Sequence, residues 1–167
     1  MKLSTIFYLL IIVFVSGYSS LAQVINDAGS IMPAELTQIV SGTTKNVGDF
    51  TNVSSGLTKA SSQTHIILIC DQLSESIIPI RENLNAAEKI LINKITEYGA
   101  SYGANQDSAF NKWYDAVMEA QSEMRDVEYT LAKLKRTEMF EHDSVSNAAK
   151  KISDAIDNVK VELTKMN

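Results

Sequence analysis

The stretch that decides the fold of this chain is residues 110–134, FNKWYDAVMEAQSEMRDVEYTLAKL. Its apolar side chains recur at alternating spacings of three and four residues, and charged side chains occupy most of the positions between them. Such a repeat draws one apolar seam along an α-helix and is typical of helices that pack against other helices. The seam consists of Phe110, Trp113, Val117, Ala120, Met124, Val127, Leu131 and Leu134. We interpret the charged face of this helix as a solvated surface.

The same seven-residue spacing continues beyond this stretch towards the end of the chain. A single helix over residues 110–166 would be about 85 Å long at 1.5 Å per residue. Glu138 would then lie on the buried seam, so we predict instead a turn at residues 140–144, with Asp143 or Ser144 capping a new helix. The apolar positions of that helix are Val145, Ala149, Ile152, Ile156, Val159, Leu163 and Met166.

A strong helical pattern also precedes residue 110. Its apolar positions are Ile66, Cys70, Leu73, Ile77, Ile80, Leu84, Ala87, Leu91 and Tyr98. Pro79 lies inside the pattern, and because proline removes one backbone hydrogen bond and clashes with the preceding turn, it predicts a kink or a break. Gly99 is a suitable C-cap, and we predict that residues 98–107 form the clearest loop of the chain.

The first helical pattern is weaker. Pro33 stands where helices begin, and Glu35 follows in the first turn, facing the positive end of the helix dipole. The apolar positions are Leu36, Val40, Val47, Phe50 and Leu57, with Ile39 and Val53 beside them. Gly42, Gly48 and Gly56 each cost a helix about 1 kcal/mol relative to alanine. We therefore expect this helix to form only by packing against its partners.

The expected architecture is all-α, with four helices at about 33–59, 64–98, 106–140 and 144–165. Because short connections make successive helices antiparallel, the prediction is an up-and-down bundle. The alternative is an extended helical hairpin or coiled coil.

The N-terminus predicts export. Lys2 precedes an apolar run of about ten residues. The small residues Ser20 and Ala22 then give the small-x-small pattern of a cleavage site, as in secretory signal peptides. The run is too short to span a bilayer, which takes about twenty residues. We predict a signal peptide over 1–22 that is cleaved after Ala22, a loose lead-in over 23–32, and a single secreted helical domain over 33–167.

The charge balance excludes some partners. Of the 15 basic and 20 acidic residues, cleavage removes Lys2, which leaves 14 against 20 and a formal charge of −6. An acidic domain without a basic block gains nothing from neutralising phosphates, so we expect no binding to nucleic acid and no stable membrane anchor.

The sequence contains no motif that specifies a reaction. It has only two histidines, no His-Glu-x-x-His, no Gly-x-Ser-x-Gly and no glycine-rich phosphate loop. A di-iron bundle needs Glu-x-x-His on two helices, and neither His65 nor His142 meets that spacing. We therefore predict no catalytic residue, no metal and no cofactor, and a protein that is not an enzyme.

Five residues remain as candidates for other roles. Asn52 begins the N-glycosylation acceptor Asn-Val-Ser. Tyr98, Tyr102 and Tyr114 surround the glycine-rich loop and are candidates for a partner or ligand surface. Cys70 is the only cysteine, and its place after four aliphatic residues favours a buried, unpaired thiol over a disulfide between chains.

Two functions fit these observations. The first is an extracellular interaction module that binds an unidentified protein through its helix faces. The second is an extracellular carrier that holds a small apolar ligand between its helices. We favour the first, because narrow stripes filled by large aliphatic side chains predict a packed core rather than a cavity.

Overall fold

The computed structural model describes residues 32–102 and 109–166, without the side chains of residues 100–102. The predicted signal peptide and all of the lead-in except Met32 lie outside the described residues. Four α-helices and one 3-10 turn follow. They are α2 (Ala34–Ser54), η1 (Leu57–Lys59), α3 (Gln63–Tyr102), α4 (Ala109–Lys135) and α5 (His142–Thr164). The all-α prediction is confirmed, with the expected order of helices.

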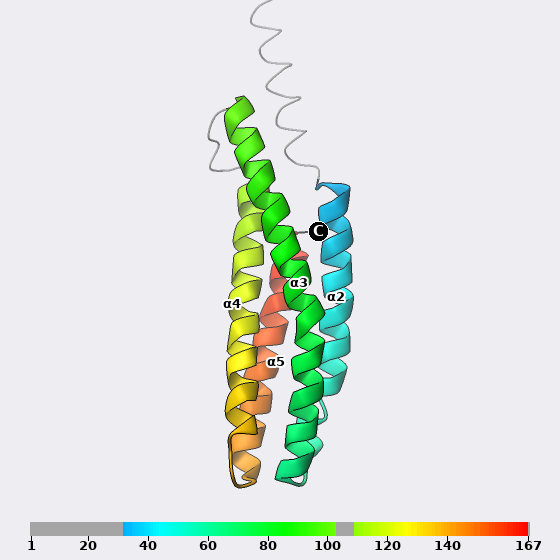
Figure 1. Ribbon diagram of the computed structural model, residues 1–167, viewed down its shortest axis with the longest axis vertical. Helices are drawn as coiled ribbons and strands as arrows, with labels where there is room; N and C mark the ends of the chain where they lie inside the picture. Colours follow the sequence, from blue (N-terminus) through cyan, green and yellow to red (C-terminus); the bar gives the residue numbers. More distant parts are fainter. Residues whose placement is uncertain (1–31, 103–108, 167) are drawn as a thin grey trace, which may run out of the picture. The chain divides into compact units, whose positions relative to one another are not determined.

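The four helices form an up-and-down bundle, as predicted. Successive helices run in opposite directions, and α3 extends beyond the N-terminal end of α2 (Figure 1). Helix α2 packs against α3 and α5, and α4 also packs against α3 and α5. The helices therefore surround one core, with α2 and α4 on opposite sides of it.

The core is built from the predicted seams. Every seam residue predicted in α4 is buried, as is nearly every one predicted in the other helices. Among the largest fully buried side chains are Phe50, Leu73, Ile80, Leu131 and Ile156. None of the helices that the structure describes combines the length and the apolar character needed to cross a bilayer.

Helix α2 ends at Ser54, five residues before the predicted end. The hydroxyl groups of Ser54 and Ser55 donate to the carbonyl oxygens of Thr51 and Asn52, at 2.9 and 2.7 Å. Such local side-chain bonds offer the backbone an alternative to continuing the helix. The chain then forms the 3-10 turn η1, in which the Leu57 side chain is fully buried.

Helix α3 differs from the sequence-based expectation at two places. Of the kink or break predicted at Pro79, the break is absent: α3 runs through Pro79, which is exposed, while Ile77 and Ile80 beside it are buried and hold the helix on the core. It also continues past Gly99 to Tyr102, so Gly99 is not a C-cap and the predicted loop does not begin at residue 98. Residues 103–107 of that loop lie outside the described residues.

A turn separates α4 from α5, as predicted, but it spans residues 136–141 rather than 140–144, and its cap is corrected. Helix α4 ends at Lys135, and α5 begins at His142, so Glu138 lies exposed in the connection rather than in the core. The residue that precedes α5 is Glu141, and neither Asp143 nor Ser144 caps the helix. The Ser144 hydroxyl instead donates to the Glu141 carboxylate at 2.9 Å.

Candidate interaction surface

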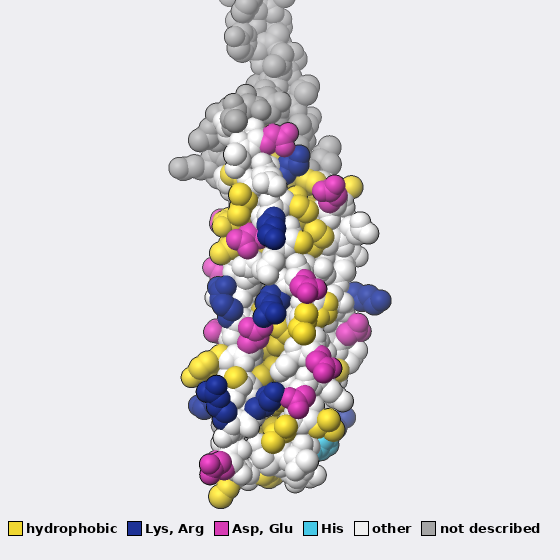
Figure 2. All heavy atoms as spheres, viewed as in Figure 1, with side chains coloured by type: hydrophobic (Ala, Val, Ile, Leu, Met, Phe, Trp, Pro, Cys, Tyr) yellow, Lys and Arg dark blue, Asp and Glu magenta, His cyan; other side chains and the backbone are white. Residues whose placement is uncertain are grey.

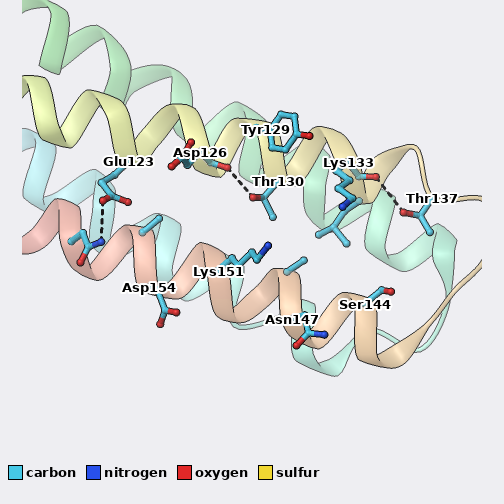
Figure 3. Close-up of a pocket in the computed structure, with 14 residues that line it drawn as sticks. Glu123, Asp126, Tyr129, Thr130, Lys133, Thr137, Ser144, Asn147, Lys151 and Asp154 are labelled. Carbon is cyan, nitrogen blue, oxygen red and sulfur yellow. Dashed lines mark hydrogen bonds between the residues drawn. The ribbon is translucent and has the colours of Figure 1, made fainter.

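An open groove of about 610 Å³ runs between α4 and α5. Figure 3 shows side chains of both helices along its length. Its lining on α4 is Glu123, Asp126, Tyr129, Thr130, Lys133 and Leu134, and Thr137 lines it just after the end of α4. Its lining on α5 is Ser144, Asn147, Ala148, Lys151, Asp154, Ala155 and Asn158.

Small side chains on α5 create the groove. Ala148 and Ala155 are seven residues apart and therefore lie on the same face of the helix, one column away from the core residues Val145 and Ile152. Because an alanine side chain fills so little space, the two helices stay in contact through the core while the outer surface between them remains hollow. The groove therefore forms because α5 places these two alanines beside α4.

Hydrogen bonds hold the walls of the groove in place. The Asn158 amide nitrogen Nδ2 donates to Glu123 Oε1 across the groove at 3.0 Å, which ties the register of α5 to that of α4. The hydroxyl of Thr130 and that of Thr137, which lies just after α4, donate to the carbonyl oxygens of Asp126 and Lys133 at 2.8 and 3.2 Å, as the dashed lines in Figure 3 show. These hydroxyls already have acceptors within α4.

The charged side chains that line the groove are separated by sign along its length. Glu123, Asp126 and Asp154 lie towards one end, whereas Lys133 and Lys151 lie further along it (Figure 3). Within the described part of the chain, the structure shows no ion pair for Asp126, Lys133 or Lys151. Asp154 pairs with Lys150 at 2.6 Å, but both side chains are exposed, and water and salt weaken such a pair.

Tyr129 lies at the rim of the groove, between Asp126 and Lys133 on α4 (Figure 3). Its side chain is 73% exposed, although an aromatic ring is among the most apolar surfaces that a protein can bury. The face of the molecule drawn in Figure 2 differs from the groove. On that face, positive and negative side chains alternate, and apolar side chains form small separate groups. The α4/α5 groove thus combines an exposed aromatic ring with Asp126, Lys133 and Lys151, for which the described residues provide no ion-pair partner.

A second groove, of about 550 Å³, lies between α3 and α4, and its charges are largely paired. Arg81 Nη1 lies 3.3 Å from Glu128 Oε1, and Lys135 pairs with Asp71. These pairs neutralise most of the positive charge that lines it. Among the residues that the structure describes, no three His, Cys, Asp or Glu side chains gather as a metal site would require.

A buried polar contact links α3 to α4. Gln121 is buried, and its Nε2 donates to Glu88 Oε2 at 2.8 Å and to Asn85 Oδ1 at 3.3 Å. Gln121 was not predicted to be buried, because it occupies a position next to the apolar seam rather than on it. A satisfied polar contact between two helices favours one register over others, so Gln121 helps to align α4 on α3.

Two of the predicted tyrosines, Tyr98 and Tyr114, do not line the groove. The Tyr98 and Phe110 rings meet edge to face, with their centroids 6.1 Å apart, and Tyr114 is half-buried on α4. Tyr102 lies in the last turn of α3, and its side chain is not described. Asn52 is exposed in the last turn of α2, a helix that does not contribute to the groove.

Cys70 is fully buried in α3 and unpaired, in line with the predicted environment. Burial disfavours the charged thiolate and raises the pKa of the thiol from 9.0 to about 11; nearby Lys135 lowers the pKa and Asp71 raises it by smaller amounts. A thiol of this kind is a poor nucleophile at neutral pH.

This environment predicts slow alkylation of Cys70. Because the pKa is raised by about two units, the thiolate fraction at pH 8 falls by about 100-fold relative to an unfolded chain. We expect iodoacetamide to label the native protein at least 100-fold more slowly at pH 8 than the same protein in 8 M urea, with labelling followed by mass spectrometry. Equal rates in both solvents would show that the thiol is accessible and that this part of α3 is not packed.

From the sequence, the face of α4 that lines the groove was predicted to be an ordinary solvated surface. One signal was available: Asp126 and Lys133 are seven residues apart, so they share a face of α4, and Tyr129 lies between them. Lys151 and Asp154 carry a corresponding pair on α5. Which face of α5 meets that face of α4 could not be read from either segment alone.

Comparison of the chain with protein-family models, with curated proteins and with solved structures found no match.

Proposed function

We propose that this protein is a secreted interaction module without chemistry of its own, which binds a protein partner through the α4/α5 groove. The observation that carries the proposal is the joint presence of an exposed Tyr129 and of charges of both signs without ion-pair partners, along one groove. Aromatic side chains dominate the binding energy of many protein interfaces, and complementary charges orient the partner.

The runner-up is a carrier of a small apolar ligand. A carrier site is a concave pocket that is lined mainly by apolar side chains and encloses most of its ligand. The α4/α5 groove has a suitable volume, but it is open along its length and lined by five charged side chains. Large side chains such as Phe50, Leu73 and Leu131 fill the interior of the bundle. These features favour a protein partner over an apolar molecule.

The first experiment tests where the protein binds. The native chain is recovered from the medium of secreting cells, immobilised, and exposed to the proteins of the same medium, which are then quantified by mass spectrometry. Tyr129→Ala and Lys151→Glu are expected to reduce the bound partner by at least tenfold, since loss of a hot-spot residue at an interface costs about 2 kcal/mol or more.

Matched controls lie on α3. Leu68→Ala removes an exposed apolar side chain, and Lys89→Glu makes the same change of charge as Lys151→Glu, and neither residue lines the groove. Both controls should retain the partner at the wild-type level. Equal loss in all four variants would refute the groove as the binding surface. A stoichiometric lipid in an organic extract of the native protein would favour the carrier instead.

A further inference from the structure

We infer that Asn52 carries an N-linked glycan, which is added during export of the chain and before α2 packs into the bundle. The inference rests on the proposed function only in requiring that the chain is secreted. It concerns α2, a helix that contributes no residue to the α4/α5 groove.

The acceptor motif for such a glycan occurs once in the sequence, as Asn52-Val53-Ser54. No other asparagine of the chain is followed by serine or threonine two residues later. The middle residue is valine, so the requirement that it is not proline is met. A chain that is exported through a signal peptide passes the enzyme that reads this motif. The sequence therefore allows one N-linked glycan, at Asn52.

The reaction is a substitution at a sugar carbon. Its co-reactant is an oligosaccharide that is joined through pyrophosphate to a membrane lipid. The amide nitrogen Nδ2 of Asn52 forms a bond to C1 of the first sugar, and the bond between C1 and the pyrophosphate oxygen breaks. The lipid pyrophosphate leaves with the electron pair of that bond, and Nδ2 loses one proton. Nothing is oxidised or reduced, and the product is a glycosylated asparagine.

The Asn52 side chain points away from the core of the bundle. Phe50 is fully buried, and two residues along a helix turn the direction of the side chain by about 200°. Asn52 is accordingly exposed. Within the described part of the chain, no hydrogen bond engages its side-chain amide, since the Ser55 hydroxyl contacts its backbone carbonyl oxygen. A glycan on Nδ2 therefore displaces no contact of the fold.

The surface of α2 around Asn52 is polar. Lys45 and Gln38 precede Asn52 by seven and fourteen residues and therefore share its face of the helix. Ser41, one turn before Lys45, lies on the same side, and all four residues are exposed. None of the exposed large apolar side chains among the described residues lies on α2. A protein partner would find little apolar area to bury here, whereas a hydrated sugar chain needs none.

The folded structure engages the hydroxyl of the acceptor motif. Ser54 is half-buried in the last turn of α2, and its hydroxyl donates to the carbonyl oxygen of Thr51 at 2.9 Å. An enzyme that reads this hydroxyl therefore needs the segment before it becomes helical. We accordingly place the transfer before the folding of α2.

The order of synthesis leaves time for the transfer. Helix α2 packs against α3 and α5, which begin at residues 63 and 142 and therefore emerge after Asn52. Most of the stability of a helix in a protein comes from tertiary packing, and Gly42 and Gly48 weaken α2 further. Asn52 is thus presented in an unfolded segment until its partner helices have been made.

The experiment analyses the full chain from the medium of secreting cells, by gel mobility and mass spectrometry, with and without peptide N-glycosidase. We expect most of the secreted wild type to carry a glycan. The enzyme should remove it and convert Asn52 to aspartate, which the tryptic fragment over residues 46–59 reports. A sample without enzyme corrects for spontaneous deamidation.

Two variants should abolish the glycan. Asn52→Gln removes the acceptor, and Ser54→Ala removes the hydroxyl but keeps Asn52, so both should have the mobility of the enzyme-treated wild type. Ser54→Thr keeps a hydroxyl and should retain the glycan. Asn93→Gln, at an exposed asparagine of α3 outside any acceptor motif, is the matched control and should retain it too. Circular dichroism of every variant must show the helical spectrum.

The outcomes separate this inference from the proposed function. A secreted wild type with unmodified Asn52 overturns the inference and leaves the groove as a binding surface. A glycan that persists in Asn52→Gln also overturns it, because the sugar would then be attached elsewhere. A chain that stays in the cytosol with residues 1–22 attached refutes both the glycan and the secreted character of the protein.

Discussion

Replacement of Phe50 by alanine is expected to lower the free energy of unfolding by about 3–5 kcal/mol, the range typical of Phe→Ala in a packed core. Phe50 is fully buried in α2. This helix contains Gly42 and Gly48, has no side-chain hydrogen bond from its N-cap residue Pro33, and depends on its packed face for stability. The cavity left by the ring would therefore weaken the helix with the least intrinsic stability.

The measurement is urea unfolding followed by far-ultraviolet circular dichroism. Leu68→Ala is the control, because Leu68 is 55% exposed and its truncation should cost about 1 kcal/mol or less. Hydrogen exchange should also accelerate more in α2 than in α4 of the Phe50→Ala variant. Equal stability of Phe50→Ala and wild type would mean that α2 is not docked on the bundle.

Replacement of Pro79 by alanine is expected to raise the free energy of unfolding by about 2 kcal/mol. Proline in a helix interior is about 3 kcal/mol less favourable than alanine. Part of the gain is offset, because alanine gives the unfolded chain more freedom, an effect of about 0.4–1 kcal/mol. Since α3 runs through Pro79 and the side chain is exposed, alanine should fit without a change in packing.

Gln72→Ala, at another exposed position of α3, is the matched control and should change stability by no more than about 0.5 kcal/mol. Thermal and urea unfolding of the three proteins would give the comparison. A Pro79→Ala variant that is less stable than wild type would contradict a continuous α3, because it would mean that the native backbone at residue 79 is not helical.

The sequence predicted the helices better than their ends. The buried seams, such as Phe110 to Leu134, follow from periodicity alone, because burying apolar surface is the dominant favourable term in folding. The C-cap predicted at Gly99 was wrong, and of the kink or break predicted at Pro79 the structure excludes the break. At Pro79 a local preference of a few kcal/mol competes with contacts made with other helices. In α3, buried neighbours such as Ile77 and Ile80 outweigh the lost hydrogen bond.

The candidate site was not predictable to the same degree. Tyr98, Tyr102 and Tyr114 were chosen because they cluster around one loop in the sequence, yet neither Tyr98 nor Tyr114 lines the groove between α4 and α5. Asp126, Tyr129 and Lys133 form a recognisable pattern on one face of α4. A pattern on one helix does not reveal which face of another helix lies beside it.

The sequence by itself therefore determined that the part of the chain described by the structure folds into four helices around an apolar core, because the spacing of apolar residues is a local property that each segment carries. Only the tertiary structure decided that Asp126 and Asp154 lie towards one end of a groove and that Lys151 and Lys133 lie further along it. The physical reason is that these positions depend on the register of α5 against α4, and that register is set by the packing of side chains and by contacts such as Asn158 to Glu123.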